Sequence, residues 1–124
     1  MANKNPLLIK TLTAAGTVNP YRIVKDGTGM VQAAAATDKL FGVAEGTKSV
    51  ASGERIDVIV AGIAPVEYGG NVSIGDLLTS DANGKAVAAA PSAGSNNRII
   101  GIAYEAGVSG DIGSVLISQG SVQG

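Results

Sequence analysis

From residue 21 onward, short runs of β-branched residues alternate with clusters of Gly, Asp, Asn and Ser. This pattern is typical of many short strands joined by tight turns. In the clearest run, Arg55–Ala61, side chains alternate with the period of two that a strand requires. The runs Arg98–Tyr104 and Ser114–Ser118 are apolar on both faces, so we expect them in the interior. Val31–Leu40 is the one segment whose composition allows a helix. The sequence therefore predicts an all-β protein.

The chain also matches itself, because residues Val18–Gly62 can be laid over Val72–Gly120. Four blocks match in order: Asp26–Ala34 with Asp81–Ala89, Leu40–Ala44 with Ile99–Ala103, Ser52–Glu54 with Ser109–Asp111, and Val58–Val60 with Val115–Ile117. Self-similarity of this kind is the signature of a repeated structural unit. We therefore predict a small pseudo-symmetric β-barrel or sandwich built from an internal duplication, with repeat units of about residues 18–62 and 72–120.

The N-terminal residues differ from the rest, because they carry little periodic pattern and contain Pro6, Gly16 and Pro20 as breakers. We expect residues 1–20 to form an extended N-terminal arm and residues 21–124 to form a single β-domain. Within the arm, Leu7, Leu8 and Ile9 are consecutive apolar residues. An exposed apolar patch is a liability unless a partner covers it, so this arm is expected to become ordered on docking.

Charge is nearly balanced, with nine basic and ten acidic residues, so nothing in it favours a nucleic acid as a partner. The distribution is uneven, since Lys4, Lys10, Arg22 and Lys25 all precede the first acid, Asp26. This asymmetry fits either an arm with a separate partner or a solvated terminus. No apolar run approaches the ~18–20 residues of a membrane span or forms a secretory signal, so we expect the protein to stay where it is made.

The chain contains neither Cys nor His. Disulfides, thiolate metal sites and thiol nucleophiles are thereby excluded, and the commonest general base and metal ligand is missing. The segment Asp81-Ala82-Asn83-Gly84 is similar to the start of a calcium loop, but Ser92 stands where the loop would need its twelfth-position Glu. We interpret these residues as a tight turn capped by Asp, with Gly at positive φ.

The remaining candidates for chemistry also have simpler structural interpretations. The carboxylate pairs Glu54/Asp57 and Asp76/Asp81 could serve acid–base catalysis, but their turn and strand settings indicate solvated surface groups. The three tyrosines could stack on sugars or bases, yet no cluster of Arg and Lys accompanies them. We interpret Tyr21, Tyr68 and Tyr104 as buried rings with a polar edge.

With the repeat and the turns in view, the chain from about Tyr21 to Ser118 resembles the small head-decoration, or capsid-cement, proteins of tailed bacteriophages. The motifs that carry the resemblance are structural, and they are Lys39–Ala44, Val60–Val66, Ile74–Leu78, Asp81–Lys85 and Ile100–Ala103. The resemblance implies a non-enzymatic structural protein without a cofactor, located on the outer capsid surface of the virion and made in the host cytoplasm.

The resemblance also implies the partners. These are the major capsid protein and further copies of the chain itself, commonly as a homotrimer, with neither nucleic acid nor membrane involved. By position, the capsid-binding arm would comprise Asn5, Pro6, Leu7, Leu8, Ile9 and Lys10. The alternative function is a carbohydrate- or receptor-binding β module of a tail fibre or cell-surface protein, which an exposed cluster of Tyr, Asp and Asn would mark.

Overall fold

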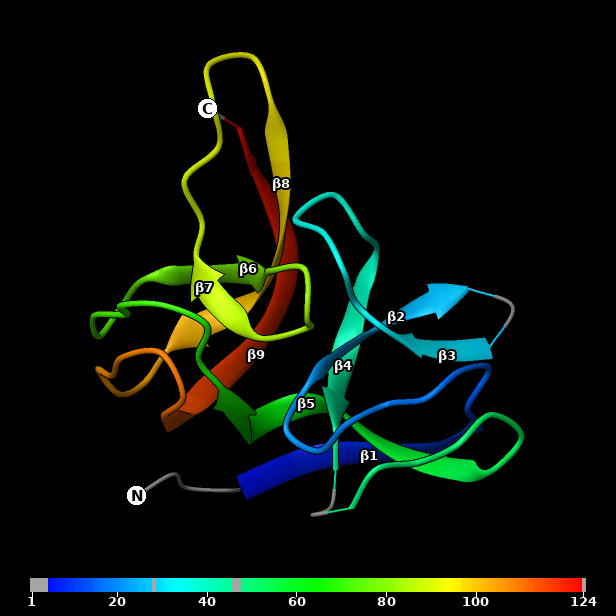
Figure 1. The fold of residues 1–124 in the computed structure, drawn as a ribbon. Helices are drawn as coiled ribbons and strands as arrows, with labels where there is room; N and C mark the ends of the chain where they lie inside the picture. The colour runs from blue at the N-terminus through cyan, green and yellow to red at the C-terminus, as the bar shows by residue number, and fades with distance from the viewer. Residues whose placement is uncertain (1–4, 28, 46–47, 124) are drawn as a thin grey trace.

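The protein folds into strands, and the part of the chain that the structure describes contains no helix. The structure is a computed structural model that describes residues 5–27, 29–45 and 48–123 (Figure 1). The strands are β1 (Asn5–Thr13), β2 (Ile23–Gly27), β3 (Gly29–Gln32), β4 (Leu40–Ala44), β5 (Arg55–Glu67), β6 (Leu77–Ser80), β7 (Ala86–Ala88), β8 (Asn96–Ala103) and β9 (Ile112–Gln123). The predicted all-β class is confirmed.

The strands form a single curled antiparallel sheet in the order β3-β2-β4-β5-β9-β8-β6-β7, with β1 paired to β5. The long strand β5 belongs to two parts of this sheet. Its first part pairs with β1 and β4, and its second part pairs with β9. We therefore call β1–β4 with residues 55–61 the first half, and residues 62–67 with β6–β9 the second half. Figure 1 shows the two groups of strands joined through β5.

The two halves repeat the same backbone contacts. Val18 and Val50 exchange two hydrogen bonds of 2.9 Å, and Val72 and Gly107 exchange two of the same length. Four further backbone hydrogen bonds in the first half each have a counterpart in the second half. With the N–H donor named first, they are Ala15–Met30 and Gly69–Ala86, Gly53–Ala14 and Gly110–Tyr68, Ala44–Arg22 and Ala103–Asp76, and Ala33–Ile23 and Ala89–Leu77. Two of these correspondences agree with the sequence blocks, namely Ala44 with Ala103 and Gly53 with Gly110. At Met30 and Ala33 the equivalent residue lies one position further along the chain than the sequence blocks place it. The internal duplication itself stays a prediction.

Among the described residues, buried apolar side chains form two clusters, and the larger one joins the halves. The smaller cluster lies in the first half and consists of Ala14, Val18, Val24, Met30, Ala44, Ile56 and Val58. The larger cluster spans both halves and consists of Ile23, Ala33, Leu40, Val43, Ile59, Ala64, Val66, Tyr68, Val72, Leu78, Ala86, Ile100, Ala103, Val115 and Ile117. The halves therefore hold together through an apolar junction as well as through β5.

Tyr68 shows how one half compensates for a larger side chain. Its backbone occupies the position of Ala14 in the other half, because the Tyr68 N–H donates to the Asp111 carbonyl as the Ala14 N–H donates to that of Glu54. The Tyr68 ring is fully buried, and a Cβ on Gly113 would collide with it. In the first half the position of Gly113 is taken by the buried Ile56. Large and small residues have exchanged places, which conserves core volume.

The Tyr68 hydroxyl donates a 2.7 Å hydrogen bond to the Glu105 carbonyl. Burial raises the pKa of Tyr68 to about 12, helped by the nearby Glu105, Asp111 and Asp76 carboxylates. The prediction of a buried ring with a polar edge is thus confirmed for Tyr68. It is wrong for Tyr104, whose side chain is 55% exposed.

Two equivalent glycines mark where neighbouring strands come closest. Gly42 and Gly101 are both buried, in β4 and β8. A Cβ on Gly42 would collide with the Ile59 carbonyl, and a Cβ on Gly101 would collide with the Leu116 carbonyl. Glycine is therefore required at both positions because neighbouring backbone occupies the space of a side chain.

The segment Val31–Leu40, whose composition allows a helix, is not helical. Its start belongs to β3, and a turn follows in which the Ala34 N–H donates to Asp38 Oδ2 at 2.8 Å. Lys25 Nζ lies 3.2 Å from the same oxygen. Desolvation raises the pKa of Asp38, but the hydrogen bonds from Ala34 and Lys25 outweigh it and hold the pKa below its ordinary value. An Asp side chain that bonds nearby backbone competes with helix formation.

Residues Asn5–Thr13 form β1, and the sequence pattern did not predict this pairing. Antiparallel partners run from Asn5 opposite Ile63 to Thr13 opposite Arg55. The register shifts between Pro6 and Leu8 and again between Leu8 and Ile9. Such irregularities break the alternation of apolar and polar residues that reveals a strand in sequence. The division of the chain into an arm and a domain stays a prediction.

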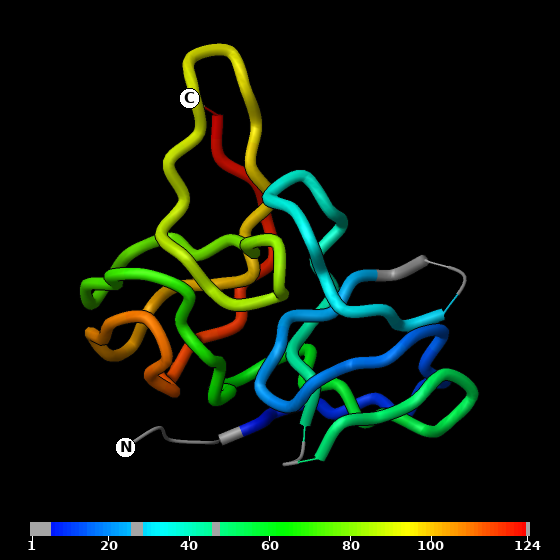
Figure 2. Tube along the Cα trace, in the orientation of Figure 1, coloured from blue at the N-terminus to red at the C-terminus, as the bar shows by residue number. Residues whose placement is uncertain are grey.

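The start of β8 and the end of β9 project together from the body of the protein. Asn96 at the start of β8 pairs with Gln123 at the end of β9. Figure 2 shows the loop before β8 and the C-terminal part of β9 rising together away from the remaining strands. The Gln119 side chain ties this projection to the first half, because its Nε2 donates to the carbonyls of Phe41 at 2.9 Å and Val60 at 3.0 Å.

We expect Gly42→Ala and Gly101→Ala each to lower the free energy of unfolding by about 1–3 kcal/mol, because the added methyl forces two strands apart. Urea denaturation measures this change. Gly120→Ala is the matched control, because no heavy atom lies within 4 Å of a Cβ there, and it should shift stability by no more than about 0.5 kcal/mol. Equal stability of all three variants would contradict the proposed close approach.

We expect Tyr68→Phe to lower stability at pH 8 by about 0.5–1.5 kcal/mol, through loss of the hydroxyl hydrogen bond. The difference should depend on pH. Since folding raises the Tyr68 pKa from 10.0 to about 12, the fold favours the neutral phenol. The stabilisation that the neutral Tyr68 phenol gives the folded state is complete below pH 10 and is lost as pH rises toward 12. Urea titrations between pH 8 and pH 11 should therefore show that the difference in stability between wild type and Tyr68→Phe becomes smaller as pH rises. A constant difference would disprove the link between folding and the Tyr68 pKa.

Candidate functional site

The segment Asn5–Lys10 forms the first part of β1, which pairs with β5 alone among the strands of the described chain. Pro6 lies opposite Gly62, and Leu8 lies opposite Ala61. Leu7 therefore has no partner on β5 and bulges from the ladder. A bulge at a sheet edge redirects the side chains next to it.

This geometry leaves three consecutive apolar side chains in solvent. Leu7 is 80% exposed, Leu8 is 50% exposed and Ile9 is 42% exposed. Lys10 is also exposed, whereas Pro6 is half-buried. We call Leu7, Leu8 and Ile9 the β1 patch. Asn5 joins the strand through its backbone opposite Ile63.

An edge strand with exposed apolar residues can bind a partner in two ways. Its unpaired backbone groups can accept a further strand, and its side chains can be buried against an apolar surface. Burying one large aliphatic side chain contributes about 1.5–3 kcal/mol. The patch is therefore suited to protein–protein contact and offers no reactive group.

The N-terminal cations that the sequence analysis grouped together are separated in the structure. Arg22 Nη2 lies 3.3 Å from Glu67 Oε1, and Lys25 Nζ lies 3.2 Å from Asp38 Oδ2. Lys10 is exposed beside the β1 patch, and Lys4 lies outside the described residues. Of the described cations in this group, Arg22 and Lys25 thus contribute to the fold.

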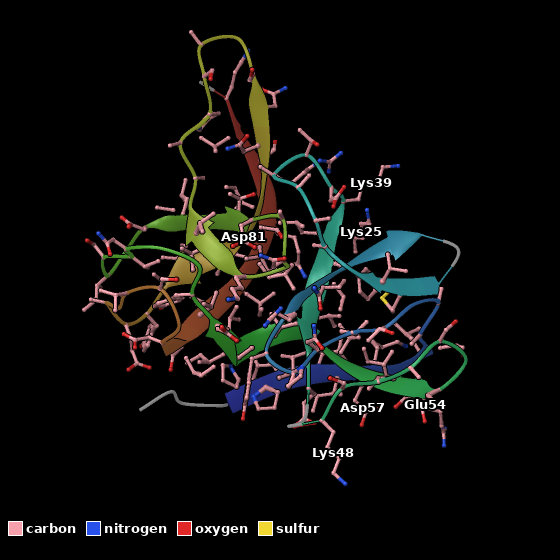
Figure 3. All side chains as sticks on the ribbon, viewed as in Figure 1. Lys25, Lys39, Lys48, Glu54, Asp57 and Asp81 are labelled. Atoms are coloured by element: carbon pink, nitrogen blue, oxygen red, sulfur yellow. The ribbon has the colours of Figure 1, made fainter. Side chains whose placement is uncertain are left out.

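The acidic side chains considered for catalysis each stabilise a local backbone or side-chain arrangement. Glu54 Oε1 accepts from the Ala51 N–H at 2.6 Å, and Asp57 Oδ1 accepts from Thr11 Oγ1 at 2.7 Å. Asp76 Oδ2 accepts from a backbone N–H in its own turn at 2.9 Å. Figure 3 shows Glu54 and Asp57 at the outer edge of the first half, away from Asp81.

Asp81 forms the capped turn that the sequence predicted. Its Oδ1 accepts from the N–H groups of Asn83 at 2.8 Å and Lys85 at 2.9 Å, and Gly84 has a φ of 75°. Across residues 5–27, 29–45 and 48–123, no group of three or more His, Cys, Asp or Glu side chains is placed to hold a metal ion. The same residues contain no helix long and apolar enough to cross a membrane.

A second apolar surface crosses the second half, and sequence reasoning missed it. Paired residues on four neighbouring strands form a continuous row in the order Leu77, Ile102, Leu116 and Ile63. Leu77 is 42% exposed, Leu116 is 39% exposed, and the other two are half-buried. We call these residues the outer row. The expectation that Ser114–Ser118 lies wholly inside is therefore wrong for Leu116.

A match to a family model decides what kind of protein presents these surfaces. The model is described as phage cement protein, and it matches residues 8–119. The chain belongs to the phage cement protein family. This cement protein is accordingly a structural protein of the phage head that binds capsid proteins. The resemblance seen in the sequence is thereby confirmed.

The fold has a solved counterpart. The N base of the head fibre protein gp8.5 of bacteriophage phi29 aligns with a TM-score of 0.65 and 21% sequence identity, covering 94% of this chain and 98% of that one. At this identity the likeness concerns the fold. The comparison with curated proteins gave no match.

Proposed function

We propose that this cement protein binds the outer surface of a phage head as a homotrimer and bridges neighbouring subunits of the major capsid protein. The observation that carries the proposal is the β1 patch, in which Leu7, Leu8 and Ile9 stand exposed on an edge strand. An exposed apolar patch of this kind marks a surface that a partner covers. Because the chain is a cement protein, we assign this partner as a capsid protein.

The proposed mechanism is burial without chemistry. Each protomer places its β1 patch, flanked by Asn5, Pro6 and Lys10, against a coat subunit. A trimer presents three such patches, so binding at one patch raises the effective concentration of the others and links the coat subunits together. Because β1 is already paired with β5, docking does not require the whole segment to become ordered, and less conformational entropy is lost than for a free arm.

We expect the double substitution Leu7→Ser/Leu8→Ser to reduce affinity for capsids by at least about tenfold, because each lost leucine removes about 1.5–3 kcal/mol of apolar burial. Co-sedimentation with purified capsids over a range of protein concentrations measures the occupancy. Substitution is preferable to deletion of the segment, because deletion would also remove the ladder partner of β5.

Val108→Ser is the control, since Val108 is an apolar residue with 55% exposure that lies far from β1 in the sequence, in the turn before β9. It should bind capsids as the wild type does. Unchanged occupancy for the double variant, or an equal loss for the control, would count against the β1 patch as the capsid-binding surface. Circular dichroism should show that every variant remains folded.

A further inference from the structure

The outer row has an equivalent in the first half, and the two differ in exposure. Ile23 pairs with Val43, and Val43 pairs with Ile59, just as Leu77, Ile102 and Leu116 pair in turn. Ile23, Val43 and Ile59 are fully buried, at 0% exposure. At these three positions the row is thus covered in the first half and open in the second. The fourth position differs, because Ile9 pairs with Ile59 as Ile63 pairs with Leu116, and Ile9 is 42% exposed.

The row in the first half is buried because the second half packs on it. Ile23, Val43 and Ile59 share the larger cluster with Val66, Ile100 and Ile117, which are interior residues of the second half. These three residues are themselves buried at this junction. One half therefore contributes a row, and the other half contributes the face that covers it.

The first half carries the corresponding face, and it is incompletely covered. The blocks and strand registers place Leu12, Phe41 and Val60 at the positions of Val66, Ile100 and Ile117. All three are only half-buried, and they pack against the smaller cluster. We call Leu12, Phe41 and Val60 the first-half face. The outer row of the second half therefore has no face packed on it, and the first-half face has no row packed against it.

We propose that these two surfaces meet between copies of the chain, with the outer row of one copy packing on the first-half face of the next. The contact repeats the junction that already joins the halves within each chain. It is a head-to-tail contact, because the two surfaces differ, and such contacts close into rings or extend into filaments. In the homotrimer of the proposed function, these would be the surfaces through which the copies touch. Only the number of copies is taken from that proposal.

Polar contacts indicate that the contact between copies is weaker than the junction within a chain. At the junction, Asn83 O accepts from Arg22 Nη1 at 2.9 Å and from Gln32 Nε2 at 2.8 Å. The positions of Arg22 and Gln32 are taken by Asp76 and Ala88 in the second half. Alanine has no polar side chain, and an aspartate carboxylate accepts hydrogen bonds and does not donate them. The second half therefore lacks the side-chain donors that Arg22 and Gln32 supply. The contact between copies is therefore mainly apolar and depends on concentration.

Sedimentation equilibrium of the purified full-length protein, without capsids, tests the proposal. Wild type should associate as its concentration rises. Leu116→Lys in the outer row and Val60→Lys in the first-half face should each weaken association by at least about tenfold, because each places a charge in an apolar contact. Val108→Lys, which changes an exposed residue outside both surfaces, should associate like wild type. If circular dichroism shows that Val60→Lys unfolds, Phe41→Ala replaces it.

Mixing the two variants distinguishes head-to-tail contact from a symmetric one. Leu116→Lys keeps its first-half face and Val60→Lys keeps its outer row, so an equimolar mixture should form pairs that neither variant forms alone. The proposal is overturned if the mixture associates no better than its components, or if Leu116→Lys associates like wild type. It is also overturned if wild type stays monomeric at about 1 mM.

The two proposals can fail separately. Leu7→Ser/Leu8→Ser changes the β1 patch and leaves both surfaces of the head-to-tail contact unaltered. It should therefore associate with itself as wild type does, even where it no longer occupies capsids. Loss of self-association in this variant would show that the β1 patch, and not the outer row, carries the contact between copies.

Discussion

The pairing of β5 with strands of both halves is the constraint on which the rest of the structure depends. Its first part forms ladders with β1 and β4, and its second part forms a ladder with β9. Because one continuous strand carries all three ladders, the position of each half is fixed relative to the other. The apolar junction then forms where Ile23, Val43 and Ile59 meet the interior of the second half. Burial across this junction gives a small chain a larger common core than either half would have alone.

Small side chains make this arrangement possible. The chain has one Phe, three Tyr and no Trp, so most of its interior is built from Ala, Val, Ile and Leu. At Gly42 and Gly101, neighbouring carbonyl groups occupy the space that a side chain would need. Tyr68 is the large exception, and the absence of a side chain at Gly113 accommodates it. The interior of this cement protein is thus filled mainly by small apolar side chains.

Those surfaces follow from how the sheet ends. The β1 patch is exposed because β1 pairs on one side only and bulges at Leu7. The outer row is exposed because nothing in the described chain packs on the second half as the second half packs on the first. Both surfaces are apolar, and they serve different contacts in our proposals. We propose that the β1 patch contacts the capsid and that the outer row contacts another copy of the chain. A cement protein benefits from having both, since lateral contacts between copies and contacts with the shell reinforce each other.

Much of the local structure could be predicted from the sequence. The runs of β-branched residues gave the strands at Arg55, Arg98 and Ser114, and the Asp81 turn follows from residues that cap and bend the chain within a few positions. Which apolar residues are covered depends instead on how distant segments pack together. Ile59 and Leu116 occupy equivalent strand positions, yet Ile59 is fully buried and Leu116 is 39% exposed. The pairing of β1 with β5 could not be predicted from the sequence for a related reason. Alternation within a strand is a local property, whereas burial depends on which distant segment packs against the strand, and a pattern of neighbouring residues does not contain that information.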